Sequence, residues 1–261
     1  MYRLLRSVAV GAGAAAAVGG ALYIVQEQQE RSRSKLAITM SNEWNFSTKQ
    51  KITQAAQAAA GPDKARYLDD ALRTLVTPNT DLRTKSADWL AGYADLLRAL
   101  GIAYASYAPE QSVAPLQAAR SIPLGNPALR AEAQVALYEA TDDPQFLGDE
   151  VSAPAALESV EDIRAWAPLL FVRAQLAIST QPKQALNELL VLHQKIAAPA
   201  NDVLCFKAKA SGFIAQLLWR LGHKTDAAAW LKAGAQDAQC GTPACRETRE
   251  MLADLQARTS K

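Results

Sequence analysis

The amino-acid sequence predicts an all-α protein, and three observations support this prediction. Hydrophobic residues make up 49% of the 261 positions, but aromatic residues only 7%, because alanine supplies much of the apolar content. Alanine favours closely packed helices, whereas sandwiches and barrels need β-branched and aromatic side chains. Glycine and proline divide the chain into segments of helical length, and no segment has the pattern of a strand.

The charge distribution argues against nucleic acid as a partner. The chain has 28 basic and 26 acidic residues, which leaves a formal net charge of +2. Binding to nucleic acid usually requires a clustered basic face, but Lys and Arg here alternate with Asp and Glu. RNA-binding helical repeats would also need a regular basic lining. We therefore expect no nucleic-acid partner.

Residues 7–26 are predicted to form a transmembrane helix. A basic N-terminus, residues 1–6, contains Arg3 and Arg6 and precedes an uncharged run that ends before Glu27. About 19 helical residues at 1.5 Å each just cross the hydrocarbon core of a bilayer. A secretory signal peptide would have a shorter, Leu-rich apolar region, and a cleavable transit peptide would be amphipathic. The length favours a retained anchor.

Small residues recur along the predicted anchor. Gly11, Ala15 and Gly19 are four residues apart and therefore lie on one face of the helix. Such a face lets a second membrane helix approach closely, which compensates for the weak hydrophobicity of alanine. The alternative is that an Ala/Gly-rich run produces this spacing by chance. We expect the face to pack against a partner helix.

A polar segment, residues 27–46, is predicted to connect the anchor to the body as a short exposed helix followed by a linker. The basic, Leu-containing start and the weakly hydrophobic anchor resemble those of mitochondrial membrane proteins, with the inner membrane favoured. Basic residues flank the anchor on both sides, so the positive-inside rule does not decide the orientation. The expected protein is single-pass.

Residues 47–240 are predicted to form helical hairpins, with breaks at GPD, APE and HKT and at Pro78, Pro123 and Pro199. An irregular segment, 141–150, follows the fifth helix. Pro168 is expected near the start of the sixth helix because proline is tolerated only in the first turn. The last segment, 241–261, is expected to be a capping helix. The expected helices are 51–60, 64–76, 87–107, 111–122, 127–140, 169–179, 180–196, 201–222, 226–238 and 244–258.

Two hairpins carry a repeat signature. In the last hairpin, large and small residues alternate around a turn glycine at Ile214, Ala215, Leu218, Gly222, Ala227, Leu231 and Gly234. In the second hairpin, the L-G-x-x-Y pattern occurs at Leu97, Leu100, Gly101 and Tyr104. These residues resemble the tetratricopeptide-repeat (TPR) family. The resemblance implies an α-hairpin solenoid in which small residues let paired helices touch. A non-repetitive helical bundle is the alternative.

The chemistry-bearing residues do not form a recognisable catalytic or metal motif. The two histidines, His193 and His223, are isolated, and no G-x-S-x-G, P-loop or H-E-x-x-H pattern occurs. The spacing of Cys240 and Cys245 is not that of a zinc site. These two cysteines either form a disulfide, if the body lies in an oxidising compartment, or remain free buried thiols.

The sequence therefore favours a non-catalytic, membrane-anchored helical scaffold that binds protein. We expect a subunit or assembly factor of a mitochondrial membrane complex, without cofactor, metal or small-molecule substrate. A TPR-type receptor or adaptor for client peptides, such as an import receptor or protease adaptor, is the alternative. An enzyme with an unrecognised site is a third class.

Overall fold

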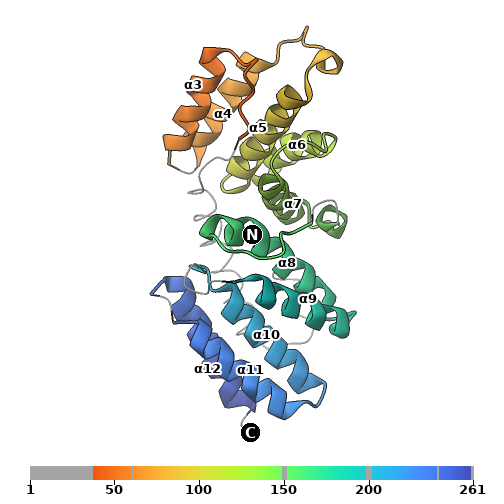
Figure 1. Cartoon of the computed structure of the whole chain (residues 1–261), viewed down its shortest axis with the longest axis vertical. Coiled ribbons are helices and arrows are strands. Elements are labelled where there is room, and N and C mark those ends of the chain that lie inside the picture. The colour runs from red at the N-terminus through yellow and green to blue at the C-terminus, as the bar shows by residue number, and fades with distance from the viewer. Residues whose placement is uncertain (1–37, 60, 149–151, 198–201, 240, 260–261) are drawn as a thin grey trace. The chain divides into compact units, whose positions relative to one another are not determined.

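The structure, a computed structural model, describes residues 38–59, 61–148, 152–197, 202–239 and 241–259. This part of the chain is all-α, as predicted, with ten α-helices and two short 3-10 helices (Figure 1). It forms two compact units that divide between residues 151 and 152. We call the described residues 38–148 the N-terminal unit and 152–259 the C-terminal unit.

The N-terminal unit consists of helices that pack against their neighbours in the chain (Figure 1). Helix α5 is its centre, because α4, α6 and α7 all pack on it, and α3 packs on α4. The elements are α3 (Phe46–Gln57), α4 (Pro62–Leu75), η1 (Leu82–Thr84), α5 (Ala87–Ala105), α6 (Pro109–Arg120), α7 (Pro127–Thr141) and η2 (Pro144–Leu147).

Local capping chemistry determines where these helices begin. The side chains of Asn45, Ser86 and Asn126 accept hydrogen bonds from backbone N–H groups in the first turns of α3, α5 and α7. These N–H groups have no partner inside the helix, so the caps stabilise the starts. The cap at Asn45 explains why α3 begins at Phe46, five residues before the expected start at Lys51.

The segment before α3 is a linker that docks on the unit. Residues 38–45 form no helix, which agrees with the linker expected there, whereas the exposed helix expected before it lies outside the described residues. Trp44 is buried, and its indole fills the space that a Cβ on Gly92 of α5 would occupy. Phe46 is 79% exposed at the start of α3. The linker is thus fixed to the body through Trp44.

The C-terminal unit is built around α10, which packs on α8, α9, α11 and α12 (Figure 1). Phe206, in the first turn of α10, is fully buried, and its ring makes an edge contact with Phe171 at 5.7 Å between centroids. The helices are α8 (Val160–Ala177), α9 (Pro182–Lys195), α10 (Phe206–Arg220), α11 (Lys224–Asp237) and α12 (Pro243–Thr259). Helix α12 covers the expected last helix.

Helix α8 differs from the sequence-based expectation. It begins at Val160, nine residues before the expected helix 169–179, and Pro168 lies in its interior. Ser159 and Asp162 form a capping box, in which each side chain accepts a hydrogen bond from the other residue's backbone N–H. Proline removes one helical hydrogen bond, but the buried residues on both sides of it, such as Trp166 and Leu169, keep the helix packed.

The predicted transmembrane helix 7–26, including Gly11, Ala15 and Gly19, lies outside the described residues. Of the helices in the described ranges, none combines the length and the apolar character that a membrane span requires.

A disulfide ties the last helix to the core of the C-terminal unit, and it does not join the two cysteines considered from the sequence. Cys245, in the first turn of α12, is bonded to Cys205, which directly precedes α10. Of the two alternatives expected for Cys240 and Cys245, a bridge between them or free thiols, neither describes Cys245, because it is bonded to Cys205. Cys240 lies outside the described residues. The packing of α12 on α10 brings the Cα atoms of Cys205 and Cys245 to 5.4 Å, although 40 positions separate them in sequence.

We expect Cys205→Ser and Cys245→Ser each to lower the free energy of unfolding of the C-terminal unit by roughly 2–4 kcal/mol, because each opens a long cross-linked loop. Cys240→Ser is the matched control and should leave stability unchanged. Denaturant unfolding measures the loss. Peptide mass mapping without reduction identifies the bridge, and a cross-link between Cys240 and Cys245 would contradict this pairing.

Candidate functional site

The candidate site of the N-terminal unit is a cleft beside α6 and α7. A buried ion pair inside α5 holds the chain segment that borders it. The side chains of Asp95 and Arg98 are 0% and 3% exposed, and Arg98 Nη1 lies 3.1 Å from Asp95 Oδ1. They are three residues apart, so the helix places them on one face. Two buried charges are tolerated only when their remaining hydrogen-bonding atoms also find partners.

The other N–H donors of Arg98 bind the end of α6 and the connection that follows it. Its guanidinium donates to the carbonyl oxygens of Ala119 at 3.2 Å, Ile122 at 2.8 Å and Leu124 at 2.7 Å. Ala119 lies in the last turn of α6, and Ile122 and Leu124 lie in the connection that follows it, so one side chain ties both segments to α5. Burial lowers the pKa of Arg98, Asp95 opposes this effect, and the charge of Arg130 adds to it.

Asp95 fixes the end of the connection between α6 and α7 that lies next to α7. Its Oδ1 accepts the backbone N–H of Asn126 at 2.8 Å, and its Oδ2 accepts that of Thr39 in the linker at 3.2 Å. Gly125 passes directly over the ion pair with φ +99°, and a Cβ there would lie 2.3 Å from Asp95 Oδ1. The α6–α7 connection therefore has a defined course and needs glycine at this position.

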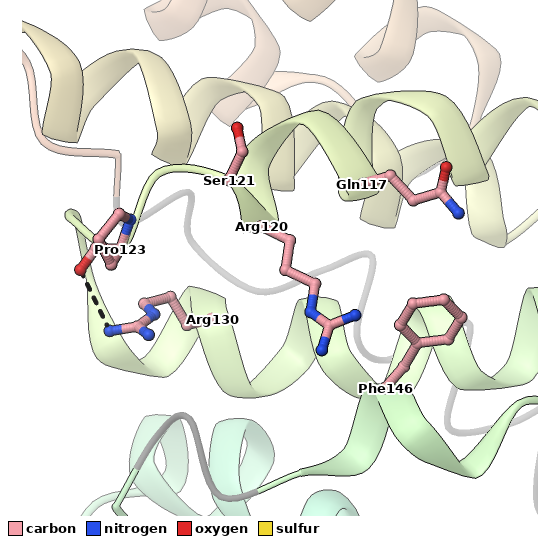
Figure 2. Close-up of a pocket in the computed structure, with 6 residues that line it drawn as sticks. All are labelled: Gln117, Arg120, Ser121, Pro123, Arg130 and Phe146. Atoms are coloured by element: carbon pink, nitrogen blue, oxygen red, sulfur yellow. Dashed lines mark hydrogen bonds between the residues drawn. The ribbon is translucent and has the colours of Figure 1, made fainter.

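This connection forms one wall of a cleft of about 660 Å³ between α6, α7 and η2 (Figure 2). Arg120, the last residue of α6, reaches toward Phe146 of η2, with its guanidinium carbon 5.1 Å from the ring centroid. Arg130 of α7 donates from Nη1 to the carbonyl of Pro123 at 3.4 Å. The six lining residues are Gln117, Arg120, Ser121, Pro123, Arg130 and Phe146.

A smaller cavity of about 30 Å³ adjoins the cleft and shares Arg120, Arg130 and Phe146 with it. Gln134 lines this inner cavity, and its buried Oε1 has no hydrogen-bond partner among the described residues. Three of the described side chains that line the two cavities are arginines, Arg98, Arg120 and Arg130, and Arg98 is paired with Asp95.

The C-terminal unit contains a second polar cluster, between α9, α10 and α11. His193 Nε2 lies 3.3 Å from Asp237 Oδ2, and its ring makes an edge contact with Trp230 at 4.9 Å. Burial and the charge of Lys207 lower the pKa of His193, against the opposing effect of Asp237. Asp202, also buried, accepts the backbone N–H groups of Phe206 and Lys207 and so caps α10. The cluster joins three helices.

The predicted repeat residues lie at helix contacts in both units. A Cβ on Gly101 would lie 2.4 Å from Leu116 Cγ of α6, and one on Gly234 would lie 3.0 Å from Ser211 Cβ of α10. Gly222 has φ +88° in the turn between α10 and α11. Tyr104 and Leu218 are half-buried. The buried members are Leu97, Leu100, Gly101, Ile214, Ala215, Ala227, Leu231 and Gly234.

Sequence reasoning missed the ion pair and the cleft arginines. Asp95 and Arg98 are the only charged residues in the apolar run from Leu90 to Tyr107, and this interruption was the available signal. Arg120 carries no such signal, because arginine is ordinary in the last turn of a helix. Among the described residues, no group of His, Cys, Asp or Glu is large enough to hold a metal ion.

The chain was compared with known protein families, curated proteins and solved structures. No protein-family model, curated protein or solved structure matches the chain.

We expect Asp95→Ala to destabilise the N-terminal unit by about 3–5 kcal/mol, because it leaves the charge of Arg98 buried without its carboxylate. Asp63→Ala is the matched control, since Asp63 and Arg66 form an exposed pair with the same three-residue spacing. Asp63→Ala should lower the free energy of unfolding by less than about 1 kcal/mol. Denaturant unfolding of both variants makes the comparison, and equal losses would contradict the role of the buried pair.

The lowered pKa of His193 predicts a pH dependence of stability. Below the ordinary pKa of 6.5, the unfolded chain takes up a proton more readily than the folded one, so stability falls as the pH falls from about 6.5 through the lower pKa of the folded state. His193→Gln should remove this part of the loss, whereas His223→Gln, at an exposed position before α11, should keep it. Unfolding free energies measured across this pH range test the assignment. An unchanged profile in His193→Gln would refute it.

Proposed function

We propose that the chain is a non-catalytic helical scaffold that binds protein, anchored in a membrane by residues 7–26. The observation that carries this proposal is the packing order of the helices. In three pairs, the first helix contacts both its own partner and a following helix: α5 contacts α6 and α7, α8 contacts α9 and α10, and α10 contacts α11 and α12. In the first pair, α4 and not α3 packs on the next helix, α5. Helical-repeat proteins are built in this way, and their function is recognition.

The small residues support a TPR-like arrangement of the hairpins. Gly101 lets α5 touch α6, and Gly234 lets α11 touch α10, at the positions where the family places small residues. Gly222 occupies the turn of the last hairpin with a positive φ. These contacts are what a stacked-hairpin scaffold requires, and they are the reason to prefer it to an irregular bundle.

The disulfide supports a location in an oxidising compartment. Cys205 and Cys245 are both buried and bonded, and such bonds are rare in reducing compartments. Together with the weakly hydrophobic anchor, this favours a body in the space between the mitochondrial membranes, with the inner membrane as the anchoring membrane. There the chain would serve as a subunit or assembly factor of a membrane complex.

The alternative is a receptor or adaptor that binds client peptides, and the arginine-lined cleft favours it. An enzyme is the less favoured class, because the groups that line the cleft are guanidinium, amide, hydroxyl and apolar groups. None of these lining residues is an acid, a histidine or a cysteine that could act in general acid–base or nucleophilic catalysis.

Extraction in mild detergent, followed by affinity purification and mass spectrometry, tests the scaffold proposal. We expect the chain to be recovered in a stable complex. Replacement of Gly11, Ala15 and Gly19 by Leu should preserve membrane insertion but reduce the amount of partner recovered, because the larger side chains block close helix packing. Recovery of the wild-type chain as a lone monomer would overturn the proposal, and unchanged recovery of partners in the triple variant would exclude the small-residue face.

A further inference from the structure

We propose that the linker, residues 38–45, acts as a latch on the α6–α7 connection, residues 121–126. While the linker is docked on α5 the connection is held in place, and release of the linker loosens it. The linker follows the segment that anchors the chain in the proposed function, so this inference rests on that function and adds a form of regulation to it. Both segments lie within the N-terminal unit.

A single buried carboxylate joins the linker to the connection. Asp95 Oδ2 accepts the backbone N–H of Thr39 at 3.2 Å, whereas Oδ1 accepts the N–H of Asn126 at 2.8 Å and lies 3.1 Å from Arg98 Nη1. Release of the linker would open Oδ2 to water. A carboxylate that is free to turn toward water holds its remaining donors less firmly, because buried polar groups of one network support each other.

The linker reaches this carboxylate because α5 has a glycine beneath it. A Cβ on Gly92 would clash with the carbonyl oxygen of Thr39 and would lie 2.6 Å from the indole of Trp44. Ile38, Ser41 and Trp44 are buried. Docking therefore depends on close contact between the linker backbone and the backbone of α5.

Unpartnered polar atoms weaken the docked state. Trp44 Nε1 and Thr48 Oγ1, at the start of α3, are buried without a hydrogen-bond partner in the described part of the chain. Each loses its contact with water and gains no bond in return. Short segments with few buried side chains open at lower free energy than the core of a domain. The linker is therefore the segment that detaches before the unit unfolds.

The connection passes this change on to the cleft. Pro123 lies in the connection and lines the cleft, and its carbonyl accepts a hydrogen bond from Arg130 of α7. A partner that pulls the linker away from α5 would thus loosen one wall of the cleft. The coupling works in both directions, because two linked sites affect each other by the same free energy.

Hydrogen–deuterium exchange of the full-length chain in detergent micelles, read by mass spectrometry, tests the latch. Thr39→Pro removes the N–H that Asp95 accepts, and exchange in residues 121–126 should rise about tenfold, the effect of one lost hydrogen bond. Met40→Pro is the matched control, because it removes the next N–H, which has no hydrogen-bond partner among the described residues. It should leave the connection protected.

A second pair of variants tests the opposite direction. Gly125→Ala places a Cβ against Asp95 Oδ1 and displaces the connection, so exchange in the linker should rise. Gly61→Ala is the matched control, since Gly61 also has a positive φ, +106°, but a Cβ there meets open space. It should leave the linker protected. Leu68→Ala, which removes a fully buried side chain of α4, shows how much exchange general destabilisation alone produces.

The latch is overturned if Thr39→Pro and Met40→Pro protect the connection equally, or if Gly125→Ala and Gly61→Ala protect the linker equally. It is also overturned if Leu68→Ala raises exchange in the two segments as much as Thr39→Pro and Gly125→Ala do. Co-purification separates this failure from that of the scaffold. A wild-type chain recovered in a complex, without these exchange changes, rejects the latch alone. A lone monomer that shows them rejects the scaffold alone.

Discussion

The buried ion pair between Asp95 and Arg98 is the constraint on which the N-terminal unit depends. It lies inside α5, yet its atoms bind the linker at Thr39, the end of α6 and the α6–α7 connection. Since both charges are removed from water, any movement of these segments would leave a charge or a carbonyl without a partner. The pair therefore specifies one course for the connection, and with it the positions of Arg120 and Arg130.

The contacts between paired helices link this polar centre to the proposed scaffold role. Leu116 of α6 packs against the backbone of α5 at Gly101, and Trp44 of the linker packs against it at Gly92. Close approach buries more apolar surface per residue, which an alanine-rich chain needs because each of its side chains is small.

The C-terminal unit is held together by a disulfide as well as by buried polar groups. Cys205 and Cys245 join the start of α10 to α12, while Asp202 caps α10 and the pair of His193 and Asp237 joins α9 to α11. A covalent bond restricts the unfolded chain, whereas buried polar pairs specify the folded packing. Both devices compensate for a core in which many of the buried residues are alanine.

Composition and the positions of glycine and proline were enough to predict an all-α fold and most helix ends, because capping and helix breaking are local effects. These local signals did not predict that α8 continues through Pro168, where buried neighbours keep the helix intact. They also did not identify Cys205 as the disulfide partner of Cys245, because the packing of α10 on α12 brings these two residues together. The cleft between α6, α7 and η2 could not be predicted either. Its residues come from α6, α7 and η2, and only the tertiary structure decides which side chains from separate helices meet. Contacts between residues far apart in the chain depend on how whole helices pack, which local sequence does not encode.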